Sequence, residues 1–97
     1  MLIKAGVDIS RLERNTRRSL NIVSKVLATH GHELIITSTY EGNHSPGSLH
    51  YANQAYDFRS IDIIDEEAFD EIVDLLGHDY DVVWELDHIH VEYDPKG

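Results

Sequence analysis

The stretch His88-Ile89-His90-Val91-Glu92-Tyr93, close to the C-terminus, decides how this chain is expected to fold. Polar and apolar side chains alternate along it, which is the pattern of a β-strand with one buried face and one open face. Successive side chains of a strand point to opposite sides. The three apolar side chains suit a helix-covered core, so His88 and His90 are expected on the open face, where a substrate can reach them.

Two other segments have the apolar spacing of amphipathic helices. Ser10-Arg11-Leu12-Glu13 resembles a capping box and Gly31 a stop, so the first helix is expected over roughly 11–30. Asp65-Glu66-Glu67 opens the second helix with acids that suit the positive end of its dipole, and Gly77 ends it. The side chains expected to face inward from the second helix are Phe69, Ile72, Val73 and Leu76.

Short β-branched or alternating runs predict the strands, and a loop rich in Gly and Pro lies between the first two of them. The order of elements is then α-β-β-α-β-β. It favours an α+β fold, a small antiparallel sheet with helices packed on one face and a zinc cleft on the open face. A chain of 97 residues is expected to form one domain, 1–97. The predicted strands cover residues 34–37, 54–59, 80–84 and 88–93.

The chain is acidic, with a formal net charge of −10 at pH 7. Most of its acids lie from Asp57 onward, where they would repel phosphate backbones, so nucleic acid is not an expected partner. The acids of the second predicted helix are expected to form a solvated face rather than a calcium site. There are no cysteines, hence no disulfides and no thiolate nucleophile. The protein is expected to be monomeric.

The sequence has neither an apolar run of the roughly 18 residues that span a bilayer nor the apolar block of a signal peptide. Membrane insertion is therefore not expected. The chain is expected to be synthesised in a cytoplasm. The place of action stays open from the sequence.

Two segments carry the residues from which a metal site can be built, Ser48-Leu49-His50 followed by Asp57, and Asp87-His88-Ile89-His90. Two imidazoles and one carboxylate form a normal three-ligand set for one catalytic Zn²⁺ whose fourth position is left to water. We take His50, Asp57 and His90 as that set, and His88 as a cleft residue. A strand histidine is more often a tolerated polar side chain, so a purely structural role without metal remains the alternative.

Hydrolysis at such a centre also requires a group that accepts a proton from the metal-bound water. Zinc lowers the pKa of that water to about 7, which makes the transfer possible at neutral pH. Asp87 and Glu85 lie close to His90 along the chain, and either carboxylate can serve. His88 can then donate to the developing oxyanion or to the leaving amine.

These segments resemble the zinc D-Ala-D-Ala carboxypeptidase family and its relative, the Hedgehog signalling domain. The family pattern is Ser-x-His, six residues, Asp, and later an acid followed by x-x-His, and it is met throughout by Ser48, His50, Asp57, Asp87 and His90. The stretch from residue 44 to residue 57 is especially similar to the Hedgehog segment. The resemblance extends over roughly residues 34–93.

The resemblance implies zinc on His50, Asp57 and His90, and Asp87 as the catalytic base. Glu85 is nearer to the Hedgehog carboxylate, offset by one residue. The resemblance also implies that His88 stabilises the transition state and that Ser48 braces the ligand loop or touches substrate. Peptidases of this family cleave peptides with D-amino acids in bacterial cell-wall peptidoglycan, sometimes as phage lysis enzymes, so lysis or phage delivery is a route by which this chain could reach the wall.

The chain departs from the family in one respect. Many of these carboxypeptidases carry an arginine ahead of the first ligand that holds a substrate carboxylate, whereas residues 37–42 offer Glu41 and no arginine. This leaves an endopeptidase as open as a carboxypeptidase. It also leaves the alternative of a non-catalytic Hedgehog-like zinc module that binds a protein or glycan partner in the same cleft.

Overall fold

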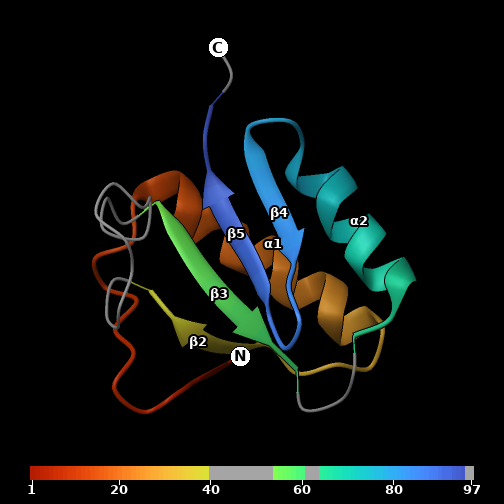
Figure 1. The fold of residues 1–97 in the computed structure, drawn as a ribbon, viewed down its shortest axis with the longest axis horizontal. Coiled ribbons are helices and arrows are strands. Elements are labelled where there is room, and N and C mark those ends of the chain that lie inside the picture. Colours follow the sequence, from red (N-terminus) through yellow and green to blue (C-terminus); the bar gives the residue numbers. More distant parts are fainter. Residues whose placement is uncertain (40–53, 61–63, 96–97) are drawn as a thin grey trace.

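The computed structural model describes residues 1–39, 54–60 and 64–95. The described chain forms two helices and one five-stranded sheet, so the protein is α+β as expected (Figure 1). The elements are β1 (Leu2–Ile3), α1 (Arg14–Thr29), β2 (Ile35–Ser38), β3 (Ala55–Arg59), α2 (Glu66–Leu76), β4 (Tyr80–Trp84) and β5 (Ile89–Tyr93).

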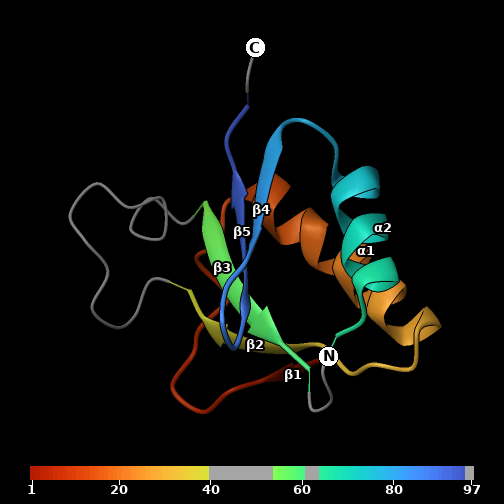
Figure 2. The ribbon, with the colours of Figure 1, turned by 45° about the vertical axis from the view of Figure 1, so that its right-hand side comes forward.

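The strands lie side by side in the order β1-β2-β3-β5-β4. Both helices cover the same side of this sheet, which leaves the opposite side free of any other described element (Figure 2). The core lies between the two layers and includes Val23 and Leu27 of α1 and Tyr56 and Phe58 of β3. This arrangement matches the predicted layers.

The sheet is mixed, and the prediction of a wholly antiparallel sheet is wrong. Leu2 and Ile3 form a short first strand that runs parallel to β2, in register with Ile35 and Ile36. The remaining pairs, β2 with β3, β3 with β5 and β5 with β4, are antiparallel. Two exposed residues are too few to display an alternating pattern, so β1 gives no signal in the sequence.

The first helix begins later than predicted, because its cap is Glu13 and not Ser10. The Glu13 carboxylate accepts hydrogen bonds from the backbone N–H groups of Asn15 and Thr16 at 3.0 and 3.4 Å. The N–H of Ser10 instead donates to Asp8, within a turn that precedes the helix. The capping-box pattern therefore places the start of the helix too early.

The second helix begins as predicted, with the Asp65 side chain capping the N–H of Ala68 at 3.1 Å. Its end is also as predicted, at Gly77, whose φ of +81° suits a residue without a Cβ. Val73 is 41% exposed, so the prediction that it faces inward is wrong. The buried stripe runs through Ala68, Ile72 and Leu76, at intervals of four residues, and Val73 lies about 100° around the helix from Ile72.

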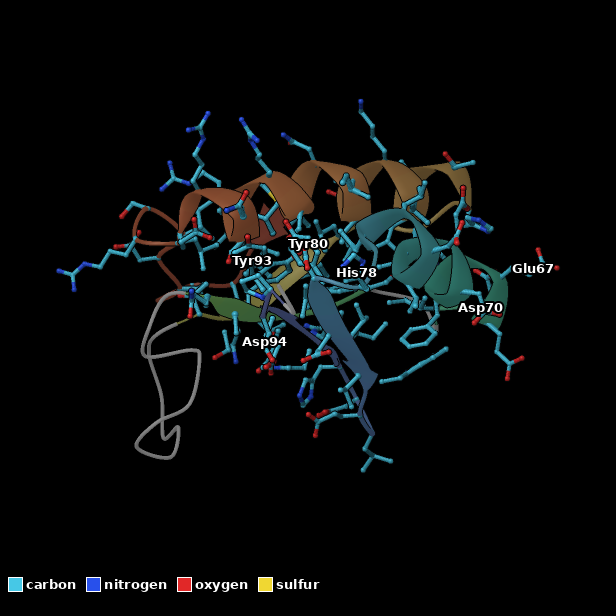
Figure 3. All side chains as sticks on the ribbon, turned by 90° about the horizontal axis from the view of Figure 1, so that it is seen from above. Glu67, Asp70, His78, Tyr80, Tyr93 and Asp94 are labelled. Atoms are coloured by element: carbon cyan, nitrogen blue, oxygen red, sulfur yellow. The ribbon has the colours of Figure 1, made fainter. Side chains whose placement is uncertain are left out.

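The alternation predicted for the last strand is present. Ile89 and Val91 are fully buried against the helices, while His90 and Glu92 point to the opposite face. Tyr93, on the core side, lies against Tyr80 with ring centroids 5.2 Å apart, beneath α1 (Figure 3). The hydroxyl of Tyr80 donates to the backbone carbonyl of Asn15 at 2.7 Å, which ties β4 to the first turn of α1.

Candidate metal centre

The pairing of β3 with β5 brings two of the predicted ligands together. These strands run antiparallel with Asp57 directly opposite His90, and side chains directly opposite one another share a face. The Oδ1 atom of Asp57 lies 2.9 Å from Nδ1 of His90, and both side chains are mostly buried. A carboxylate and an imidazole are thus held side by side on the open face by the backbone of the sheet.

The second nitrogen of His90 has its own carboxylate partner. Nε2 lies 2.7 Å from Oε1 of Glu92, which is two residues further along the same strand and therefore on the same face. The sequence reasoning placed Glu92 on this face but assigned it no role. The strict alternation of β5 was the signal that could have identified it.

His90 is held between two carboxylates. Burial lowers the pKa of His90, but its hydrogen bonds with Asp57 and Glu92 raise it, and the net pKa is above the ordinary value. A neutral imidazole can donate only one N–H, so contact with both carboxylates favours the protonated ring. A divalent cation bonded to Nδ1 and Asp57 would take the place of that proton, while Glu92 would still accept the N–H at Nε2.

His88 lies beside this pair, at the end of the β4–β5 turn. Its Nε2 atom is 3.9 Å from Oδ2 of Asp57 and 3.9 Å from Oε1 of Glu85. Its Nδ1 atom is 2.7 Å from Oδ1 of Asp87. The two carboxylates that the sequence offered as alternative bases therefore contact opposite ends of the His88 ring, Glu85 on the side of Asp57 and Asp87 on the other.

The hydrogen bond from His88 lowers the pKa of Asp87. A carboxylate with a lowered pKa is a weaker proton acceptor. The position of Asp87 instead suits a residue that fixes the ring orientation of His88, as the carboxylate of a hydrolase triad does for its histidine. Glu85, which is half-exposed on the side of Asp57, has no such hydrogen bond to His88, since the two are 3.9 Å apart.

The remaining predicted site residues, His50 and Ser48, lie outside the described residues. The structure thus places Asp57, His90, His88, Asp87 and Glu85 in one region of the open face. The third predicted ligand and the predicted substrate contact are not among the described side chains.

Comparison with family models and with curated proteins finds no match for this chain. In the part of the chain that the structure describes, neither helix has the length and apolar character needed to cross a bilayer.

Proposed function

We propose that this protein is a zinc-dependent peptidase that hydrolyses peptide bonds in bacterial cell-wall peptidoglycan, with the Hedgehog/DD-peptidase type of fold. The observation that carries the proposal is the meeting of Asp57 Oδ1 and His90 Nδ1 at 2.9 Å on the open face. It is supported by the motif that contains both residues and by the histidine and carboxylates beside them.

The donor set fits zinc. Zn²⁺ binds carboxylate oxygen and imidazole nitrogen at about 2.0–2.2 Å, and two atoms 2.9 Å apart can both reach one ion at that distance. Glu92 on Nε2 supplies the outer carboxylate that zinc-binding histidines commonly have, which leaves Nδ1 as the ligand atom. His50 would complete the set, as the family resemblance implies.

A bound zinc ion would supply a Lewis acid that polarises the scissile carbonyl and lowers the pKa of water to about 7. The protein's own groups would do the rest. His88, oriented by Asp87 at Nδ1, presents Nε2 toward the ligand pair and is placed to donate a hydrogen bond to a developing oxyanion.

The proton acceptor is one of two carboxylates. The spacing to His90 favours Asp87, as in the family motif. The geometry favours Glu85, because Glu85 lies toward Nε2 of His88 and Asp57, whereas Asp87 is engaged at the other ring nitrogen. We assign Glu85 as the acceptor and Asp87 as a positioning residue for His88.

Digestion of purified peptidoglycan tests the proposal. The zinc-loaded wild type should release new amine termini, and Glu85→Gln should lose this activity while it retains zinc. Asp87→Asn should lose less, and its activity should depend differently on pH because His88 is no longer oriented. If both variants and the wild type bind zinc but cleave nothing, the chain is instead the Hedgehog-like binding module, and the enzyme proposal fails.

Two matched controls keep this test specific. Asp70→Asn removes a carboxylate from α2, on the far side of the sheet, and should leave activity unchanged. His90→Gln should abolish cleavage together with zinc binding at this centre. Cleavage that survives His90→Gln would show that the activity arises elsewhere.

A further inference from the structure

The end of α1 lies beside the start of α2 (Figure 1). A second group of histidines and carboxylates comes together there. His30 caps the C-terminal end of α1, and His32 follows two residues later, before β2. Both rings reach across to Asp65, the residue that caps the N-terminal end of α2. From the sequence, the histidines are interpreted only as caps or surface residues, and nothing along the chain links them to a carboxylate more than thirty residues away.

The two imidazoles converge on one carboxylate. Nε2 of His32 lies 2.7 Å from Oδ1 of Asp65, and Nδ1 of His30 lies 3.3 Å from Oδ2. Oδ2 also accepts the N–H of Ala68, so it maintains the helix cap while Oδ1 faces His32. The carboxylate can therefore bind a cation through Oδ1 without giving up its role at the start of α2.

Each histidine has features of a ligand rather than of a solvated surface group. Nε2 of His30 lies 2.8 Å from Oε2 of Glu71, an outer carboxylate that leaves Nδ1 of the ring for a cation. The side chain of His32 is only 10% exposed, and its Nδ1 atom is buried with no hydrogen-bond partner within the described residues. His32 thus has only its Nε2 atom, the one that faces Asp65, available for bonding.

Glu67, which Figure 3 labels, lies in the first turn of α2. Its carboxylate adds a further oxygen to the group. The ligand atoms of His30, Asp65 and Glu67 all lie within 4.8 Å of one another. Imidazole nitrogens combined with carboxylate oxygens suit zinc and similar transition-metal ions, whereas calcium and magnesium prefer oxygen ligands.

We propose that His30, His32 and Asp65, with Glu67, form a second transition-metal site, separate from the centre at Asp57 and His90. Bound there, an ion of the zinc class links the α1–β2 turn to α2 and stabilises their contact. This site does not depend on the proposed peptidase activity, because none of its residues belongs to that centre.

The test is zinc titration by calorimetry at neutral pH on the His90→Gln variant, which lacks the first centre. One equivalent of zinc should still bind and should raise the melting temperature. Adding His32→Gln should weaken this binding by more than the roughly 10- to 100-fold that loss of an outer partner costs, because it removes a ligand. His78→Gln on the same background is the matched control, because His78 is 86% exposed and lies away from the cluster, next to Asp79. A large excess of calcium should not compete.

A second variant guards against a folding defect. Asp65→Asn retains an oxygen for the Ala68 N–H, so α2 should still begin at the same residue by circular dichroism while zinc binding falls. The proposal is overturned if His90→Gln binds no zinc, or if His32→Gln and Asp65→Asn bind zinc as tightly as their background. In the first of these outcomes the peptidase proposal is unaffected, since all zinc would then belong to Asp57 and His90.

Discussion

Oδ1 of Asp57 and Nδ1 of His90 lie 2.9 Å apart although 33 residues separate them in the chain. The distance is set by the sheet, because β3 and β5 pair in a register that puts these two residues opposite each other. Both are mostly buried, and the carboxylate of Glu92 supports the far side of the imidazole. The close approach of these two side chains is therefore a property of strand pairing.

Replacing Asp57 by asparagine should weaken zinc binding by more than the 10- to 100-fold that loss of an outer partner costs. The amide has the same shape as the carboxylate but carries no charge and is a poor zinc ligand. The titration should use a His32→Gln background, so that the site between α1 and α2 does not contribute. Asp70→Asn is the control. Equal affinity in the Asp57→Asn variant and its background would exclude Asp57 as a ligand.

The Glu92→Gln substitution should lower zinc affinity about 10- to 100-fold and leave the fold intact. Glu92 accepts the N–H at Nε2 of His90, and a neutral amide oxygen is a weaker acceptor that orients the ring less firmly. Glu85→Gln is the matched comparison, because it should change cleavage and not affinity. A Glu92→Gln variant that binds zinc as tightly as the wild type would remove Glu92 from the site.

The position of the α1 cap can be tested by stability. Glu13→Ala should lower the free energy of unfolding by about 1 kcal/mol, because it removes the acceptor for two N–H groups at the start of the helix. Ser10→Ala should change it by less than about 0.5 kcal/mol, since Ser10 makes its hydrogen bonds with Asp8 and Arg17 through its backbone. Urea unfolding of the two variants measures both values, and the opposite ranking would restore the capping box at Ser10.

The layers of the fold could be predicted from the sequence, because the spacing of apolar side chains along a single strand or helix shows which of its faces is buried. The alternation of β5 and the four-residue spacing of Ile72 and Leu76 each indicate a buried face without knowledge of any partner. β1 could not be predicted, because a two-residue strand is defined only by its pairing with Ile35 and Ile36. The predicted start of α1 is wrong because Ser10 and Glu13 are both acceptable caps, and the turn after Asp8 decides between them.

The candidate site was partly predictable for the same reason. The sequence placed His88 and His90 on the open face, and its motif put Asp57 in one ligand set with His90. It could not specify that the two residues would lie directly opposite each other on paired strands, because register between strands depends on the whole sheet. The sequence also could not show that Glu85 and Asp87 lie at opposite ends of the His88 ring, because both residues are simply close to His88 along the chain. The convergence of His30 and His32 on Asp65 depends on how α1 and α2 meet.

Tyr80 makes the stability of the protein sensitive to pH in the alkaline range. Burial raises the pKa of Tyr80 above its usual value, whereas the unfolded chain ionises its tyrosines near pH 10. Above about pH 10 the folded state therefore holds more protons than the unfolded state, and the free energy of unfolding falls as the pH rises.

Tyr80→Phe should accordingly cost about 1 kcal/mol at neutral pH, through loss of the hydrogen bond to the Asn15 carbonyl. The difference between this variant and the wild type should stay constant up to about pH 10 and shrink above it. Urea titrations from pH 7 to pH 11 measure it. A difference that does not vary with pH would show that Tyr80 ionises alike in both states.

The turn between β4 and β5 is closed by a hydrogen bond of 2.8 Å from the N–H of Glu85 to the carbonyl of His88. The backbones of Glu85 and His88 are thus joined directly across the turn of one hairpin. Under the proposed function, a bound peptide would meet a carboxylate and an imidazole whose backbones are already joined by the hairpin.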